Sequence, residues 1–235
     1  MEGNEQRVDR RGHRAAGERV STLKRLLVVW LVGFAGISAV GLQTVVPAET
    51  LLLDASVVGG GHWYGGMVTS FIVLGWAVAA VSMIGAGYAS VKSGRQRAAV
   101  TLLSGSAIVM LLLFDDLLQL HTTVIPGLFG GSKWVLIGIE AALTAGWIVA
   151  GLPELRRTRW ELLVAAGVGF ASSILLDQWV LFRDQWALVA EDGAKALGVL
   201  ALATWAFSTA GDLISSMVAP HEQTWPSREG LEQRV

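Results

Sequence analysis

Cysteine is absent from this chain of 235 residues. Its absence excludes disulfide bonds, thiolate catalysis and any zinc or iron–sulfur site that depends on cysteine. A bound metal ion would therefore rest on histidine, aspartate or glutamate. Charged residues are also scarce, at 16% of the chain, whereas an average soluble domain has about 25%. The net charge of -1 provides no basic field, so we expect no nucleic-acid partner.

The short motifs of well-known soluble enzymes are missing too. The sequence contains no GxxxxGK phosphate loop, no HExxH and no GxSxG. The glycines 59–61 precede His62 and indicate a flexible loop. Serines inside the apolar runs have no base at a readable spacing, so we expect them to bond to backbone carbonyls or a neighbouring helix. Whether the protein is an enzyme is left open.

Apolar residues are abundant, at 53%, and the mean hydropathy is +0.53. A helix needs about 20 apolar residues to cross a bilayer. Six runs reach this length: 23–46, 65–89, 98–120, 133–152, 160–182 and 190–218. The first is too long for the core of a signal peptide and should remain as an anchor. The sequence thus predicts an all-α bundle of six transmembrane helices.

The domain organisation follows from these runs. We expect a disordered cytoplasmic tail over residues 1–23, a transmembrane domain over 24–218 and a cytoplasmic C-terminal tail over 219–235. The polar residues 1–23 carry too little apolar surface to offset the entropy of ordering.

Loop charges predict the orientation of the bundle. One side collects Arg7, Arg10, Arg11, Arg14, Arg19, Lys24, Arg25, Lys92, Arg95, Arg97, Arg156, Arg157, Arg159, Arg228 and Arg234. The other side has Lys133, Arg183 and Lys195. Cytoplasmic loops are enriched in lysine and arginine. Both termini are therefore expected in the cytoplasm of a cell-membrane protein.

Ionisable residues inside the spans are the candidate functional residues, because buried charge in a membrane is costly and is usually functional or paired. At about 1.5 Å per residue, they converge on one layer in the outer third of the bilayer. The expected site is Asp115, Asp116, His121, Glu140, Asp177, Glu191 and Asp192. Asp115 and Asp116 diverge by about 100° on a helix, so only one should face the bundle centre fully. Asp177 and Glu140 need a partner from another helix, water or a cation.

Lys195 lies four residues after Glu191, a spacing that favours a structural ion pair. Three interpretations of the layer remain open. A divalent metal would bind the carboxylates, with His121 or His62 added for zinc. A proton relay would use crowded carboxylates. A structural network would pair the acids with Lys195, Lys133 and Arg183.

Two successive predicted hairpins carry a weak internal echo. It relates two sets of residues at similar intervals: Asp116, Lys133 and Trp147, then Asp177, Lys195 and Trp205. A duplicated hairpin would explain it, since transporter folds often contain repeats. Chance similarity of spacing is the alternative.

A resemblance rests on two short motifs: Asp115–Asp116 with His121, and Glu191–Asp192 with Lys195 and Gly198. With them the chain, over residues 111–205, resembles a group of uncharacterised bacterial and archaeal polytopic membrane proteins. Thr122 stands where that group often has glutamate, which removes a potential second ligand beside the histidine. The resemblance implies a shared polar site and no particular reaction. Alkaline ceramidases and microbial rhodopsins fit less well, because the chain lacks a histidine pair spaced four apart and has six spans.

We therefore expect cation binding, of a metal or a proton, at an outward-facing site, with transport as an extension. The alternatives are a metal-dependent hydrolase acting on lipid and a non-catalytic subunit or assembly factor of a larger complex. The expected cofactor is a divalent metal cation and no other. Expected partners are membrane lipids, with a homo-oligomer or a larger membrane complex left open.

Overall fold

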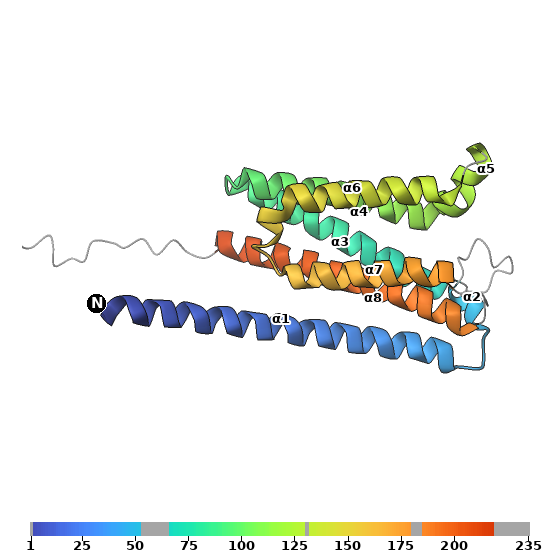
Figure 1. Ribbon diagram of the computed structural model, residues 1–235, viewed down its shortest axis with the longest axis horizontal. Helices are drawn as coiled ribbons and strands as arrows, with labels where there is room; N and C mark the ends of the chain where they lie inside the picture. The colour runs from blue at the N-terminus through green and yellow to red at the C-terminus, as the bar shows by residue number, and fades with distance from the viewer. Residues whose placement is uncertain (1, 53–65, 130–131, 180–184, 219–235) are drawn as a thin grey trace, which may run out of the picture.

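The computed structural model describes residues 2–52, 66–129, 132–179 and 185–218, and these residues form helices joined by short connections (Figure 1). The helices are α1 (Glu2–Leu42), α2 (Ala48–Leu52), α3 (Met67–Lys92), α4 (Gln96–Leu118), the π-helical turn η1 (Leu120–Val124), α5 (Ile125–Phe129), α6 (Lys133–Leu155), α7 (Trp160–Trp179) and α8 (Gln185–Val218). The described part of the chain contains no strand, so the prediction of an all-α fold is confirmed.

Six of these helices are long and apolar enough to span a membrane, as the sequence predicts. The spanning segments are Ser21–Leu42, Met67–Lys92, Gln96–Leu118, Lys133–Leu155, Trp160–Asp177 and Gln185–Met217. Their ends differ from the predicted ends by a few residues. Helix α8 starts at Gln185 instead of residue 190, because residues 185–190 also favour a helix. The predicted end of the fifth span, residue 182, lies outside the described residues. The predicted C-terminal tail, 219–235, lies outside the described residues.

The start of helix α1 also differs from the prediction. It begins at Glu2, whereas the sequence predicts a disordered tail over residues 1–23. This tail is rich in arginine and glutamate, which are good helix formers. Adding a residue to an existing helix avoids the cost of nucleation, so the following span can propagate backwards through polar residues.

Helix α8 lies at the centre of the bundle. It packs against α3, α7 and α1, while α3 also packs against α4, and α4 against α6. The core between α3 and α8 is formed by residues such as Ala79, Met83, Val199 and Trp205, each at most 1% exposed. The surface of the bundle remains apolar, with Leu31 exposed at 74%. Such a surface suits contact with lipid tails.

The two ends of the bundle are distinct. Short elements α2, η1 and α5 gather at one end, which we call the outer end, and the α3–α4 and α6–α7 connections lie at the opposite, inner end (Figure 1). The start of α1 and the end of α8 lie at the inner end (Figure 1). Six spans that alternate in direction account for this placement.

Candidate functional site

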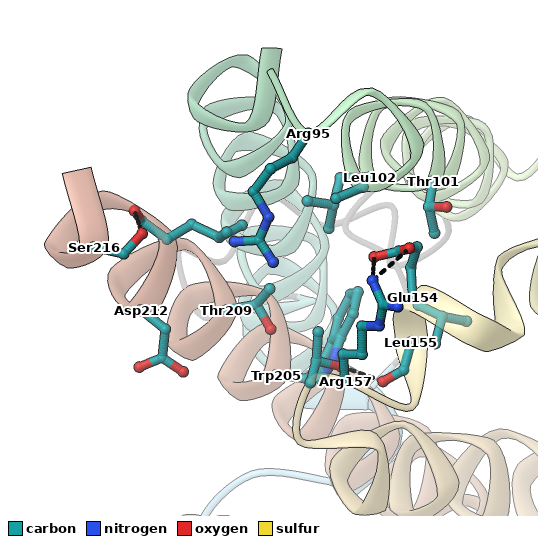
Figure 2. A pocket seen from close by; sticks show the side chains of 13 residues that line it. Arg95, Thr101, Leu102, Glu154, Leu155, Arg157, Trp205, Thr209, Asp212 and Ser216 are labelled. Carbon is teal, nitrogen blue, oxygen red and sulfur yellow. Dashed lines mark hydrogen bonds and ion pairs between the residues drawn. The ribbon is translucent and has the colours of Figure 1, made fainter. Parts of the chain in front are cut away.

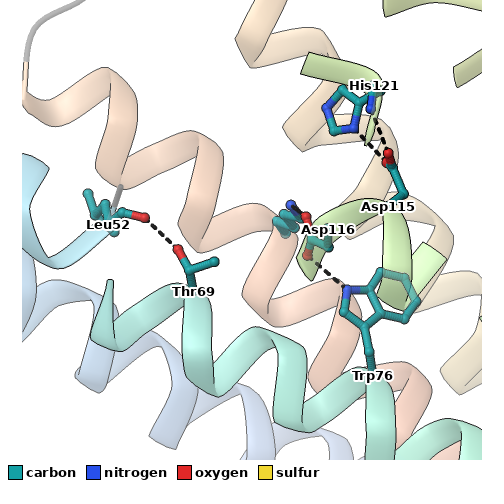
Figure 3. A network of polar contacts seen from close by, with 7 residues as sticks. Leu52, Thr69, Trp76, Asp115, Asp116 and His121 are labelled. Atoms are coloured by element: carbon teal, nitrogen blue, oxygen red, sulfur yellow. Dashed lines mark hydrogen bonds and ion pairs between the residues drawn. The ribbon is translucent and has the colours of Figure 1, made fainter. Parts of the chain in front are cut away.

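Asp116 is held by two other helices near the outer end of α4. Its Oδ1 accepts a hydrogen bond from the Lys195 ammonium group of α8, and its Oδ2 accepts one from Trp76 Nε1 of α3 at 3.1 Å. Figure 3 shows the indole of Trp76 pointing at the carboxylate. The residue is only 9% exposed. A buried carboxylate needs such charge and hydrogen-bond compensation.

Asp115 points to a different partner. Its Oδ1 accepts from the backbone N–H of His121 at 2.8 Å, and its Oδ2 lies 2.5 Å from His121 Nδ1 (Figure 3). Asp115 is 6% exposed, so both neighbouring carboxylates are buried, and they turn to different partners, as their divergence around the helix requires. Burial of both is possible because each has a partner on its own side of α4.

The backbone explains how His121 reaches back to Asp115. Helix α4 ends at Leu118, and its C-cap Gln119 has a φ of 51°, in the left-handed region that residues other than glycine rarely adopt. The chain then enters the π-helical turn η1, and Val124 N–H donates to Gln119 O at 3.2 Å. π-helical turns and left-handed non-glycine residues are enriched at functional sites.

Glu140 of α6 is the exception in this layer. It is 7% exposed, and its Oε1 has no hydrogen-bond partner in the part of the chain that the structure describes. The charged groups close enough to act on it are Asp115, His121, Asp116 and Lys195. Glu140 therefore belongs to the same polar layer, as the sequence predicts, but one of its oxygens accepts no hydrogen bond from any described residue.

Asp177 receives a partner from another helix, as the sequence requires. Lys133 Nζ at the start of α6 donates to Asp177 Oδ2 of α7 at 2.6 Å. This ion pair is one that the structural-network interpretation includes. Arg183, another predicted partner, lies outside the described residues, as does His62.

Two ion pairs connect two helical hairpins of the bundle. We call α4 and α6 the first hairpin, and α7 and α8 the second. Asp116 of the first binds Lys195 of the second, while Asp177 of the second binds Lys133 of the first. The acid of each hairpin thus pairs with the lysine of the other.

Trp147 of the first hairpin and Trp205 of the second also contact each other. The rings of Trp147 and Trp205 lie 6.2 Å apart at 75°, an edge-to-face contact. Trp147 Nε1 donates to Thr101 O at 2.8 Å, and Trp205 Nε1 donates to Thr158 Oγ1 at 2.9 Å. Each indole thus bonds to a threonine near the inner end, and the contact lies below the polar layer.

Other parts of the predicted site are changed. Glu191 and Asp192 do not open the last helix, because α8 begins at Gln185, and they lie nearly two turns inside it. Lys195 binds Asp116, a partner remote in sequence, and its pairing with Glu191 stays a prediction.

The geometry gives no support to the predicted metal centre. Within the described residues, no group of three or more histidine, aspartate or glutamate side chains is arranged to hold a metal ion. Oxygens of Asp115, Asp116 and Asp177 are instead occupied by His121, by Lys195 and Trp76, and by Lys133. The residues present therefore do not fit a divalent cation bound by the whole predicted set.

Sequence reasoning missed Trp76 as a site residue. Its only signal is a tryptophan in the middle of a span, away from the interfaces where tryptophan is usually found. In the structure it is 4% exposed and stacks on Phe170 with centroids 5.1 Å apart. Packing places its N–H against Asp116, and no spacing rule within one helix reveals that contact.

Comparisons with known proteins identify a family but no activity. No curated protein and no solved structure matches the chain. The family described as Domain of unknown function (DUF8692) matches residues 25–209, which include every residue of the site discussed above. Since this match covers most of the chain, the protein belongs to the DUF8692 family.

Proposed function

We propose that the protein binds and releases a proton from the outer side of the membrane, with Glu140 as the proton acceptor. The observation that carries this proposal is the buried carboxylate oxygen of Glu140, which has no partner among the described residues. A buried polar atom without a hydrogen bond is costly. A proton on the carboxyl group removes the buried charge without requiring further ligands.

The Asp115–His121 pair is proposed as the link between Glu140 and the outer end. Both residues act electrostatically on Glu140, and His121 is the more accessible, with 24% of its side chain exposed. An imidazole is suited to accept and pass on protons near neutral pH. Asp115, which contacts both ring and backbone of His121, orients the ring.

A proton is favoured over a metal ion because a metal ion would need several carboxylate oxygens that are already hydrogen-bonded. A divalent cation takes several oxygen ligands. Here the carboxylate oxygens of Asp115 and Asp116 already accept hydrogen bonds from His121, Lys195 and Trp76. A metal ion at these oxygens would have to displace those donors.

Binding is favoured over conduction across the membrane. Below the polar layer, the contact between Trp147 and Trp205 separates it from the inner end, and the indole N–H groups there are bonded to Thr101 and Thr158. Aromatic rings in edge-to-face contact offer no chain of proton acceptors. We infer that protons enter and leave at the outer end.

This proposal includes the finer topology. The bundle is a multi-pass protein of the cell membrane with its inner end in the cytoplasm, as the loop arginines indicate. Because the chain has no cysteine, a single introduced thiol gives labelling without background. Ser132→Cys, at the outer end, should react with a membrane-impermeant maleimide in intact cells, and Ser93→Cys, at the inner end, only after lysis. Labelling in the reverse order would contradict the topology.

The function is tested by infrared difference spectroscopy on the protein in lipid nanodiscs, stepped between acidic and alkaline buffer. We expect a C=O band of a protonated carboxyl group that appears at low pH, and its loss in Glu140→Gln. His121→Ala should keep the band but slow its rise after a pH jump, because the link to the outer end is broken.

The matched control is Asp212→Asn, which changes an acid that is exposed near the inner end and should leave the Glu140 band intact. An unchanged band in Glu140→Gln would contradict the proposal. If wild type shows no titrating carboxyl band at all, the acids serve only to hold the helices together, as expected of an assembly factor.

A further inference from the structure

The turn that follows α4 has a backbone conformation that its own sequence disfavours. Gln119, the C-cap of α4, has a φ of 51° and a ψ of 44°. This left-handed conformation is unfavourable for residues other than glycine, which is the usual residue at such helix ends. Leu118, Gln119 and Leu120 are good helix formers, so the local sequence favours a helix that continues. A contact from outside the turn is therefore needed to hold it bent.

The contact between Asp115 and His121 holds the turn. One carboxylate accepts from the backbone N–H of His121 at 2.8 Å and lies 2.5 Å from the ring Nδ1. Figure 3 shows the backbone nitrogen and the ring of His121 both directed at this carboxylate. Asp115 is 6% exposed, and hydrogen bonds to an ionised group that is shielded from water are strong. A single side chain thus fixes both the ring and the backbone of His121.

A continued helix and the Asp115–His121 contact exclude each other. In an unbroken helix, His121 lies six residues after Asp115, about 9 Å further along the axis and about 120° around it. The imidazole cannot reach the carboxylate from there, and the N–H of His121 would bond to the carbonyl of Leu117 instead. The end of α4 therefore has two alternative arrangements, which we call the bent form, present in the structure, and the continued helix.

The difference between the two forms matters for Glu140. The turn η1 packs against α6, which carries Glu140, as well as against α4. His121 and Asp115 are among the charged groups that act on Glu140. The bent form keeps the imidazole beside the polar layer, whereas the continued helix moves it away.

We propose that the end of α4 is a switch, which connects Glu140 to the outer end in the bent form and disconnects it in the continued helix. Its role rests on the proposed function, because it controls the path of the proton through His121. Asp115 holds the switch bent, and the left-handed conformation of Gln119 is the strain that favours the continued helix. Strained backbone of this kind is concentrated at active sites and in switch regions.

Distances between two spin labels measure which form is populated. Because the chain has no cysteine, Met67→Cys and Gly127→Cys provide the only two labelling sites. Met67 is 37% exposed at the start of α3, and Gly127 lies in α5, directly after η1, where a Cβ would meet nothing within 4 Å. Pulsed electron paramagnetic resonance in nanodiscs should show one main distance for the bent form and a second distance for the continued helix.

Two substitutions should shift the populations in opposite directions. Asp115→Asn removes the charge that holds His121 and should raise the ratio of continued to bent form at least tenfold. Gln119→Gly removes the cost of the left-handed conformation and weakens a continued helix, so it should lower this ratio about tenfold. The double variant should return close to wild type.

The matched control is Leu118→Gly, one residue before the bend. Leu118 is helical in the bent form and would stay helical in the continued helix, so glycine costs the same in both forms. The ratio of the two distances should therefore not change in Leu118→Gly.

The rise of the Glu140 carboxyl band after a pH jump measures the connection itself. Asp115→Asn should slow this rise several-fold, and adding Gln119→Gly to the same protein should restore it. If Asp115 acted only through its charge, the rise would be slow in both proteins alike, and this result would overturn the proposal.

Failure of the switch and failure of proton binding give different results. A single distance that neither Asp115→Asn nor Gln119→Gly changes overturns the switch, whether or not Glu140 shows a band. Distances that shift as expected, in a wild type without a Glu140 band, support the two forms of the turn and contradict Glu140 as the proton acceptor.

Discussion

Replacement of Lys195 by methionine should lower the free energy of unfolding by about 3 kcal/mol, because removing one partner of a buried ion pair leaves the other charge uncompensated. Asp116 is 9% exposed and, among the described residues, keeps only Trp76 as a donor once Lys195 is gone. Methionine retains the length and the apolar stem of lysine, so the change in packing is small. The unfolding free energy can be measured by denaturation in mixed micelles.

The double variant Asp116→Asn/Lys195→Met should recover most of this loss. Asparagine carries no charge to be compensated, and its side-chain oxygen can still accept from Trp76 Nε1. Lys24→Met is the control, because Lys24 is exposed on α1 and should change stability by less than about 0.5 kcal/mol. A Lys195→Met protein as stable as wild type would show that Asp116 is compensated in another way.

Replacement of Gly169 by alanine should destabilise the bundle by about 2–3 kcal/mol through overpacking. A Cβ at this position would lie 2.7 Å from the Cα and the N of Gly198 and 2.9 Å from Ala194 O. These are backbone atoms of α8, so no side chain can rotate away to relieve the contact. Membrane helices that approach this closely depend on small residues. Thermal unfolding in nanodiscs measures the effect.

The matched control lies two residues earlier on the same helix. A Cβ at Gly167 would meet nothing within 4 Å, so Gly167→Ala should be neutral or slightly stabilising. The intrinsic gain in helix propensity is equal in both variants, and only the contact with α8 differs. Equal stability of the two alanine variants would contradict the close approach of α7 and α8.

The sequence predicts the fold well because its dominant signals are local. Six apolar runs, each long enough for a span, are readable one by one, and the structure places a helix over each. The errors occur where polar and apolar stretches join. Helices α1 and α8 begin earlier than predicted, at Glu2 and Gln185, because the residues before each predicted span also favour a helix.

The sequence predicts how deep the site residues lie along the helices, but it does not predict which side chains contact each other. The level of Asp115, Asp116 and Glu140 follows from their distance to the ends of the spans. Which groups meet depends on how the helices pack, so the reach of Lys195 to Asp116 and the contact of Trp76 are not readable. The sequence indicates only that the acids of the two hairpins could pair with Lys133 and Lys195, and the structure shows that the acid of each hairpin pairs with the lysine of the other.

A pocket of about 170 Å³ at the inner end, between α4, α6 and α8, could not be predicted from the sequence for a different reason (Figure 2). Arg95 and Arg157 read as ordinary positive charges of cytoplasmic loops, and Thr209 reads as one polar residue in an apolar run. Only the packing of α4, α6 and α8 brings them to one cavity.

Charged groups of two hairpins form one cross-linked polar layer, and double-mutant cycles test this layer most directly. Cycles with Asp116→Asn and Lys195→Met, and with Asp177→Asn and Lys133→Met, should give coupling energies of about 1–3 kcal/mol. The mismatched cycle, Asp116→Asn with Lys133→Met, should be additive within about 0.5 kcal/mol. Additive behaviour of both matched pairs, or equal coupling in the mismatched pair, would contradict the account.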